Sequence, residues 1–261
     1  LVYLQHGILH AHMPWKYSAD RLLMDKEVVS TCYEHRILRD TYGFSEKKLI
    51  LSGMPRFDFI DHNAPPKKKI LFAPSWRKYL VDEVPPLTFK PKTQLFEQSS
   101  FWNKIRLFFE NTSLEQMLAE NGYELDIKLH PIFGVYKSYF EFSNTRVNLV
   151  DDVSESEYQI LITDYSSWVY DFVYLKRAII YFFPDTEEFS AGLNGYRELD
   201  MPLEQGFGPI AKKEEELLEY LGEAIGNKGH PTSPFAYRMD RFFYHYDNKQ
   251  RYRLYNALSQ S

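Results

Sequence analysis

Residues 159–185 read QILITDYSSWVYDFVYLKRAIIYFFPD. An apolar run suited to a buried strand ends at Thr163, a Ser166-Ser167 pair follows, a helical segment runs to about Lys176, and a second apolar run completes a strand–turn–helix–strand unit. The first amides of a helix lack intrahelical partners and lie at the positive end of the helix dipole. With two hydroxyl side chains beside them, these amides predict a seat for a phosphate or diphosphate, which we interpret as the diphosphate site of a nucleotide-activated donor.

The rest of the chain repeats this alternation of strands and helices. Expected strands cover residues 1–5, 27–31, 48–52, 70–73, 125–129, 147–150, 159–162 and 178–183, and expected helices cover residues 33–42, 101–110, 114–121, 168–176 and 214–225. Alternation of this kind implies parallel strands joined by right-handed crossovers, and therefore α/β domains of the doubly wound type. A polar, proline-rich break at residues 62–69 divides the alternation in two. We therefore expect one domain portion over residues 1–64, a donor-binding domain over 65–234 and a helical tail over 235–261 that packs back on the first.

Composition narrows the class of protein. The 261 residues are 44% hydrophobic and 26% charged, as in ordinary globular proteins, and the formal net charge of −5 argues against nucleic acid as a partner. The single cysteine, Cys32, excludes an internal disulfide and suits a reducing compartment. Because Leu1 opens directly into a predicted strand, we expect the sequence to be the C-terminal portion of a longer chain, with the first domain incomplete.

Two histidines end predicted strands, one in each half of the chain. His6 lies in QHG, where Gly7 admits a close neighbour, and His130 lies in KLHP, where Pro131 forces the chain out of the strand. An imidazole at such a position can act as a general base or can stabilise a leaving group. Each alone is also compatible with an ordinary loop histidine, but one histidine from each side is what catalysis in a domain cleft requires.

Two arginines and one carboxylate are further candidates for substrate contacts. Arg56 in GMPRFD and Arg77 in APSWR follow predicted strands, and a planar guanidinium pairs well with two diphosphate oxygens. Each arginine could equally be a surface residue or part of an ion pair. Asp171 lies one helical turn beyond the serine pair, where it could accept from ribose hydroxyls or could be an exposed helical acid. Asp164 is interpreted as a structural residue at the turn.

One helical segment has two interpretations. FWNKIRLFF, residues 101–109, places Phe101, Trp102, Ile105, Phe108 and Phe109 on one broad face. This face is typical of a helix packed on a core, and it also fits an interfacial helix that rests on an anionic membrane surface. The aromatic and basic tail at residues 235–255 is ambiguous in the same way.

Familiar cofactor signatures do not occur in the sequence. We find no metal-ligand cluster, glycine-rich phosphate loop, GxGxxG fingerprint or nucleophile elbow. The sequence therefore requires no cofactor, although it leaves the question of a metal open.

Taken in order, QHG, GMPRFD, ILFAPSWR, KLHP, LITDYSSWVYDF, AIIYFFPD and GFGPI resemble the catalytic region of the CDP-glycerol glycerophosphotransferase family of teichoic-acid primases and polymerases. The resemblance covers about residues 1–225. It implies a GT-B-like pair of Rossmann-type domains with the active site between them. It also implies transfer of glycerol phosphate, or another polyol phosphate, from a CDP-glycerol or CDP-ribitol donor to a lipid-linked saccharide or polymer acceptor, with release of CMP.

Matched residue by residue, the resemblance implies roles for several side chains. His6 corresponds to the proposed base on the acceptor hydroxyl, His130 to a second essential histidine near the diphosphate, and Ser166 and Ser167 to diphosphate-binding hydroxyls. The chain departs from the family at HGILHAHMPWKY and at Tyr196-Arg197-Glu198, so Arg197 is a substrate-binding candidate without a defined role. These departures concern the identity of the substrate more than the type of reaction.

The resemblance also implies a place in the cell, a peripheral position on the cytoplasmic face of the membrane during synthesis of a teichoic-acid or capsule-type polymer. Two alternatives stay open at this point. The same cleft could serve a GT-B glycosyltransferase that uses a nucleotide sugar. The chain could also be a non-catalytic nucleotide-binding module apposed to the membrane.

Overall fold

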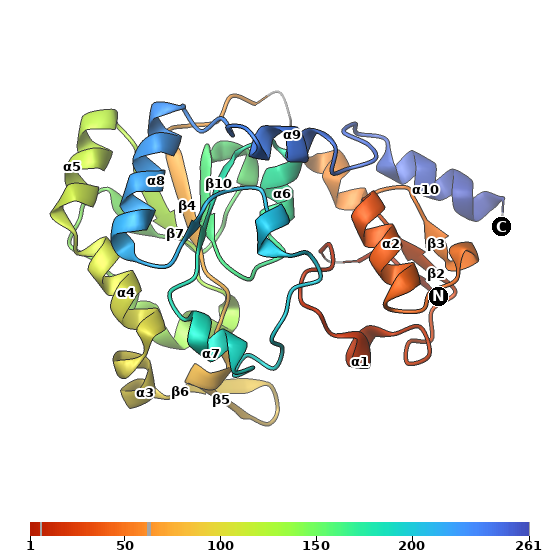
Figure 1. The fold of residues 1–261 in the computed structure, drawn as a ribbon, viewed down its shortest axis with the longest axis horizontal. Coiled ribbons are helices and arrows are strands. Elements are labelled where there is room, and N and C mark those ends of the chain that lie inside the picture. The colour runs from red at the N-terminus through yellow and green to blue at the C-terminus, as the bar shows by residue number, and fades with distance from the viewer. Residues whose placement is uncertain (6, 62–63, 261) are drawn as a thin grey trace.

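The computed structural model describes residues 1–5, 7–61 and 64–260, and these form two parallel β-sheets and one hairpin. Figure 1 shows the larger sheet and its helices on one side of the molecule and the smaller sheet on the other. The strands are β1 (Val2–Tyr3), β2 (Lys26–Val28), β3 (Leu49–Ile50), β4 (Lys69–Ala73), β5 (Val81–Val84), β6 (Thr88–Pro91), β7 (Glu124–Ile127), β8 (Val147–Leu149), β9 (Ile160–Thr163), β10 (Ala178–Phe182) and β11 (Ile210–Ala211).

The helices cover the sheets and form the C-terminal tail. They are α1 (Pro14–Tyr17), α2 (Cys32–Asp40), α3 (Thr93–Gln98), α4 (Ser100–Phe109), α5 (Thr112–Asn121), α6 (Val169–Tyr174), α7 (Thr186–Ser190), α8 (Glu214–Gly226), α9 (Phe235–Asp240) and α10 (Gln250–Ser259). Short 3₁₀ segments are η1 (Glu46–Lys48), η2 (Pro55–Phe59), η3 (Lys78–Leu80), η4 (Pro131–Phe140), η5 (Glu155–Glu157) and η6 (Leu203–Gln205). The strands and helices expected from the sequence are all present, with ends that differ by one to three residues.

The larger sheet has the strand order β11-β10-β9-β4-β7-β8, and all its pairs are parallel. When these six strands are numbered 1 to 6 in chain order and the sheet is read from β8, the order is 3-2-1-4-5-6. This is the arrangement of doubly wound dinucleotide-binding folds. The chain reverses its direction of winding between β4 and β9. In open sheets of this kind the loops at that switch point diverge and leave a crevice at the carboxyl ends of the strands, which is where ligands bind.

The strands of the larger sheet are buried on both faces, as parallel strands require. Ile160 and Ile162 of β9 belong to a core cluster with α4, α5 and α8, whereas Leu161 belongs to a second cluster with α6. This period of two places one layer of helices on each side of the sheet. The doubly wound architecture predicted from the apolar runs is therefore the one observed.

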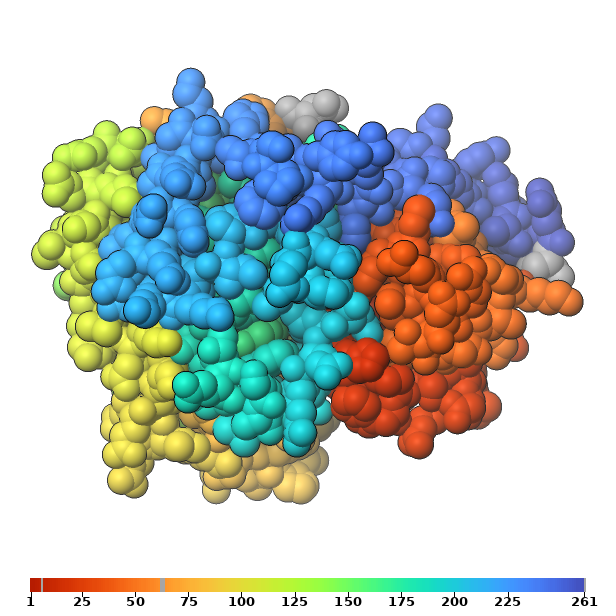
Figure 2. Space-filling model, in the orientation of Figure 1, coloured from red at the N-terminus to blue at the C-terminus, as the bar shows by residue number. Residues whose placement is uncertain are grey.

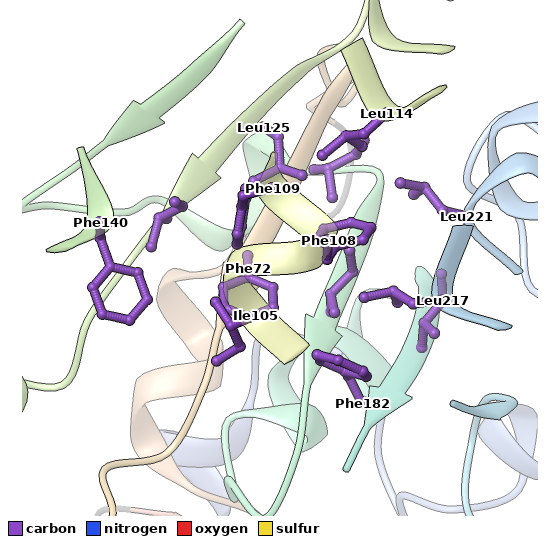
Figure 3. Close-up of a cluster of buried hydrophobic side chains, with 14 of the residues drawn as sticks. Phe72, Ile105, Phe108, Phe109, Leu114, Leu125, Phe140, Phe182, Leu217 and Leu221 are labelled. Carbon is purple, nitrogen blue, oxygen red and sulfur yellow. The ribbon is translucent and has the colours of Figure 1, made fainter. Parts of the chain in front are cut away.

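Helix α4 faces this core and not the solvent. Phe101, Trp102, Ile105, Phe108 and Phe109 are all buried, and Figure 3 shows Ile105, Phe108 and Phe109 among side chains from the sheet and from α8. Ser99 is the N-cap of the helix, and its hydroxyl accepts a hydrogen bond from the amide of Trp102. The interpretation of this segment as a membrane-interfacial helix is therefore wrong, since its aromatic face is occupied by the protein's own core.

The smaller sheet, β1-β2-β3, is also parallel and is joined to the C-terminal tail. Asp58 of η2 accepts hydrogen bonds from the backbone amides of Gln250 and Arg251 at the start of α10, at 2.8 and 2.9 Å. A backbone bridge also joins Thr31 to Phe243. The tail thus returns to the N-terminal region, as Figure 1 shows for α10 beside β3 and α2.

Several short elements were absent from the sequence-based prediction, among them α1, α3, α7, β11, the hairpin β5–β6 and η4. The antiparallel hairpin β5–β6 carries few buried residues, so it has no strong apolar pattern. The 3₁₀ segment η4 follows His130 and buries Phe133, Tyr136 and Phe140.

In the described part of the chain, none of the helices combines the length and the apolar character needed to cross a bilayer.

Candidate functional site

A cavity of about 310 Å³ lies at the switch point of the larger sheet. The loop after β4 forms one wall and the turn after β9 forms another, while the loop after β7 contributes His130 and the loop after α7 contributes Asn194 and Tyr196. We call it the central cavity. Its lining residues are Ala73, Pro74, Ser75, Trp76, Lys78, Lys128, Leu129, His130, Pro131, Tyr165, Ser166, Ser167, Trp168, Asn194 and Tyr196.

The serine turn presents donors to this cavity from a different position than the sequence predicted. Helix α6 begins only at Val169, and the amides of Val169 and Tyr170 already donate to the carbonyls of Ser166 and Ser167. The amide of Trp168 donates to the Ser166 hydroxyl at 3.2 Å. Among the described residues, the backbone amides of Ser166 and Ser167 and the Ser167 hydroxyl have no partner. The free donors for an anion therefore lie in the turn before the helix and not in its first turn.

His130 has a defined orientation and tautomer in this wall. Its Nδ1 accepts a hydrogen bond from the amide of Ile132 at 3.2 Å, so in the neutral imidazole the proton resides on Nε2. The ring stacks on Trp76 with 6.1 Å between centroids. Burial, aided by the nearby charge of Lys128, lowers the pKa of His130, which favours this neutral form. The side chain can therefore donate one hydrogen bond from Nε2 without carrying a charge.

Arg77 does not line the central cavity. Its side chain is fully buried, its Nε and Nη2 donate to both oxygens of Asp185 at 2.6 and 2.8 Å, and its Nη1 lies 2.7 Å from Asp164. Burial opposes the charge of this guanidinium, but the two carboxylates outweigh burial and hold the pKa of Arg77 above its usual range. This geometry disagrees with direct binding of a diphosphate by Arg77, because every side of the guanidinium that could meet an anion already meets a carboxylate.

The buried group of Arg77, Asp164 and Asp185 supports the cavity from behind. Asp164 also accepts from the amide and hydroxyl of Ser75 at 2.8 and 2.6 Å. It therefore ties the loop after β4 to the turn after β9, while Asp185 ties both to the end of β10. The structural role predicted for Asp164 agrees with these contacts, although the contacts hold two loops together instead of capping a helix.

Arg56 and Asp171 meet each other instead of a substrate. Both terminal nitrogens of Arg56 donate to the carboxylate of Asp171, the second at 2.8 Å, and Asp171 is buried. Neither residue lines the central cavity. Binding of ribose hydroxyls by Asp171 disagrees with this arrangement, because the carboxylate is covered and its oxygens are engaged. The pair instead joins η2, beside the smaller sheet, to α6 of the larger unit.

A second cavity of about 180 Å³ adjoins the central one on the side of the smaller sheet and shares Tyr165 and Ser167 with it. Gly7 lines this cavity, and a β-carbon at Gly7 would lie 2.9 Å from the hydroxyl oxygen of Ser167. A larger residue at position 7 would require the Ser167 hydroxyl to rotate away, so the glycine allows this close approach of the two halves. His6, the predicted base, lies outside the described residues.

The second cavity also contains an acidic side chain that the sequence reading did not select. Glu27 is almost fully buried, and its Oε1 accepts a hydrogen bond from the side-chain Nε2 of Gln5 at 3.2 Å. Burial raises the pKa of Glu27 to about 7 and that of the neighbouring buried Glu34 to about 8. The signal that could have pointed to Glu27 is a carboxyl group inside a short strand of an α/β unit, beside the buried Val28.

Lys78 is a further residue that the sequence reading missed. It is exposed and lines the central cavity, and its ammonium group makes no hydrogen bond or ion pair within the described ranges. Its position directly after the APSWR motif was the available signal.

Arg197 lies in a third cavity, described below. No group of three or more His, Cys, Asp or Glu side chains in residues 1–5, 7–61 and 64–260 is arranged to hold a metal ion.

Comparison with known proteins finds relatives that match almost the whole chain. The model of the family described as CDP-Glycerol:Poly(glycerophosphate) glycerophosphotransferase matches residues 10–260. The chain is 27% identical over 98% of its length to the minor teichoic acid biosynthesis protein GgaB of Bacillus subtilis, and 28% identical over 81% of its length to a teichoic acid poly(glycerol phosphate) polymerase of the same organism. It spans only 29% and 28% of those two proteins.

A solved structure of the wall teichoic acid polymerase TagF has the same fold. It superposes with a TM-score of 0.61 at 18% identity, over 98% of this chain and 68% of that one. The GT-B-like α/β architecture expected from the sequence is therefore confirmed.

Proposed function

Since the chain belongs to the CDP-glycerol:poly(glycerophosphate) glycerophosphotransferase family, we propose that it transfers a polyol-phosphate unit from a CDP-linked donor to a hydroxyl of a polymer or lipid-linked acceptor. Glycerol phosphate is the expected unit, with ribitol phosphate as the variant. The reaction releases CMP and extends a teichoic-acid or capsule-type polymer. The observation that carries the proposal is the central cavity, in which the free amides of the serine turn, the Nε2 proton of His130 and the charge of Lys78 lie around one space.

These groups suit a diphosphate better than a sugar. The turn amides and the Ser167 hydroxyl are aligned donors, and Lys78 is a cation without a competing carboxylate in the described part of the chain. Hydrogen bonds from donors of this kind become stronger as charge develops on phosphoryl and leaving oxygens. The buried group behind the cavity keeps the donors in place, so little reorganisation is needed during the reaction.

The proposed chemistry is an in-line displacement at the donor's β-phosphorus. The acceptor hydroxyl oxygen forms a new bond to that phosphorus, the bond to the oxygen bridging the two phosphates breaks, and the bridging oxygen leaves with CMP. His6 takes the hydroxyl proton as general base. His130 donates from Nε2 to the charge that develops on the diphosphate, and Lys78 offsets part of this charge.

The test is a panel of CDP-glycerol, CDP-ribitol and nucleotide sugars incubated with the full-length protein and membrane extract. We expect CMP to be released from a CDP-polyol. We expect His130→Ala to lower turnover by at least two orders of magnitude, as loss of an electrostatic stabiliser does. Release of a nucleoside diphosphate from a nucleotide sugar would instead establish the glycosyltransferase alternative. CDP-polyol binding with no turnover in the presence of acceptor would establish the non-catalytic module.

Membrane attachment is a further part of the proposal, and we assign it to the C-terminal tail. Tyr252 and Tyr255 on α10 and Tyr237 on α9 are exposed, and basic residues lie among them at Arg241 and Arg251. Exposed aromatic and basic side chains on short helices are typical of peripheral contact with anionic lipid. Co-sedimentation with phosphatidylglycerol vesicles at low salt should fall when Tyr252 and Tyr255 are both changed to Ser. A wholly unbound wild-type protein would contradict this assignment.

A further inference from the structure

We propose that a third cavity, where the loop before α1 meets the loop after α7, binds a phosphodiester group of the acceptor chain. This inference rests on the proposed function, because it concerns the acceptor of that reaction. The cavity measures about 410 Å³, and the residues that matter in it are His12, Trp15, Tyr196, Arg197 and Glu198. It is the site of Arg197, the substrate-binding candidate to which the sequence pattern assigns no role.

Arg197 is a cation available for a ligand. Within residues 1–5, 7–61 and 64–260 its guanidinium makes no hydrogen bond or ion pair. The side chain is exposed and packs over Gly192, where an added β-carbon would lie 2.6 Å from Nε of Arg197. Gly192 also has a φ of +78°, which favours glycine. An unpaired guanidinium in a cavity is suited to a phosphodiester, which offers two oxygens to its fork of donors.

The opposite wall provides an apolar surface and polar partners. Trp15 of α1 is 52% exposed, which is unusual for the largest aromatic side chain, and it lines the cavity. The CH groups of a polyol can pack on such a ring. His12 is held by Asp200, with 2.7 Å between Nδ1 and Oδ1, and the Glu198 carboxylate can accept from polyol hydroxyls. The cavity therefore combines one cation with groups that bind hydroxyls, which matches a polyol phosphate.

The cavity is fixed in position and adjoins the donor site. The amide of His12 donates to the carbonyl of Glu198 at 3.0 Å, and an antiparallel bridge joins Ala11 to Leu199. Figure 2 shows the surfaces of these two segments meeting, with the red N-terminal region against the cyan loop. Tyr196 lines both this cavity and the central cavity. A chain lying in the third cavity is thus separated from the donor by one side chain.

Charge explains why such a site is needed. A poly(glycerophosphate) acceptor carries one negative charge per unit, and this protein has a formal net charge of −5. The overall field therefore repels the acceptor, and a local cation must offset that repulsion where the growing end is held. Arg197 supplies that cation at a distance of one side chain from the reacting centre.

Binding of a soluble three-unit glycerol-phosphate oligomer to the full-length protein, measured by calorimetry without donor, tests this site. Wild type should bind, and Arg197→Ala should weaken binding at least tenfold. The matched control Arg36→Ala removes an exposed arginine of α2 that lines none of the three cavities, and it should bind like wild type. Trp15→Ala should weaken binding of the oligomer but not of inorganic phosphate.

The outcomes separate the site from a lipid site and from the proposed function. Arg197→Ala should leave co-sedimentation with phosphatidylglycerol vesicles unchanged; lost vesicle binding with normal oligomer binding would assign Arg197 to lipid and overturn the inference. In turnover assays Arg197→Ala should raise the KM for acceptor and not that for CDP-polyol. An unchanged acceptor KM, or no oligomer binding by wild type, overturns the site alone. If oligomer binding depends on Arg197 but no CMP is released, the proposed reaction is contradicted and the acceptor site is still supported.

Discussion

Arg77 is paired with two buried carboxylates that hold the loops of the central cavity in place. Its motif suggested a diphosphate ligand, and its partners are instead Asp164 and Asp185, which lie 87 and 108 positions further along the chain. Nothing local in the sequence reveals a pairing at that separation. The same is true of Arg56, whose bidentate partner is Asp171. By contrast, the serine turn and His130 line the central cavity, and their positions at a turn and at a strand end could be predicted because such places leave a local pattern.

Replacing Arg77 should therefore destabilise the fold. Arg77→Ala leaves two buried carboxylates without their cation, and loss of one partner of a buried ion pair costs about 3–5 kcal/mol. Urea denaturation measures this loss. The control is Lys78→Ala at the next position, where an exposed, unpaired side chain should change stability by no more than about 0.5 kcal/mol while weakening donor binding. If Arg77→Ala has normal stability but loses affinity for the donor, Arg77 binds the diphosphate.

Glu27 should make stability depend on pH. Burial raises its pKa to about 7 from an ordinary value of 4.5, so between these pH values the folded state keeps a proton that the unfolded chain has lost. The folded state binds more protons in that window, and stability therefore falls as pH rises, the contribution being complete below about 4.5 and lost above about 7.

Glu27→Gln removes this titration, so its urea midpoint should fall less than that of wild type between pH 5 and pH 8. Glu219→Gln, on the exposed face of α8, is the control and should follow the wild-type pH profile. A Glu27→Gln profile that is parallel to the wild-type profile would show that Glu27 is ionised in the folded protein.

At the scale of elements, the apolar runs predicted the parallel strands and the helices that cover them. Buried strands such as β9 and β10 are short apolar runs, and such runs are visible in the sequence without a structure. The hairpin β5–β6 could not be predicted, because VDEV and TFKP place few side chains in the core. The two interpretations of α4 could not be separated either, since an aromatic face has the same pattern whether it meets a sheet or a membrane.

Two neighbouring residues of α4 test this assignment. Phe108 is fully buried and Phe108→Ala should cost about 3–5 kcal/mol in unfolding free energy, as truncation of a core phenylalanine does. Leu107 is 45% exposed on the same turn, and Leu107→Ala should cost no more than about 0.5 kcal/mol. Equal stabilities of the two variants would contradict the core position of this face.

At the scale of the whole molecule, the tail connects the two units. Gln250 is buried, and its side-chain Nε2 donates to the Tyr174 hydroxyl of α6 at 2.7 Å. The backbone amides of Gln250 and Arg251 donate to Asp58 beside the smaller sheet. Asp58 thus acts as the cap of α10 from a position 192 residues earlier in the chain. The sequence suggested that the tail packs back, but a cap supplied from so far away has no local signature.

Removal of this cap should loosen the tail. Asp58→Ala leaves the first amides of α10 without an acceptor, a loss of about 1–2 kcal/mol for a helix cap, and amide hydrogen exchange in residues 250–259 should speed up about tenfold. Asp152→Ala, which removes an exposed acid of the larger unit, should leave this exchange unchanged. Unaltered protection of α10 in Asp58→Ala would show that apolar packing alone holds the tail.

The close approach of Gly7 to Ser167 bears on how this protein can vary over time. A β-carbon at position 7 meets the hydroxyl at position 167, so each position limits which residue the other can accept. A lineage that exchanged Ser167 for alanine would gain room at position 7, whereas one that keeps the serine accepts a β-carbon there only when the hydroxyl rotates away. We therefore expect the two positions to drift as a linked pair among natural descendants, with side chains at position 7 found more often where the hydroxyl has been lost.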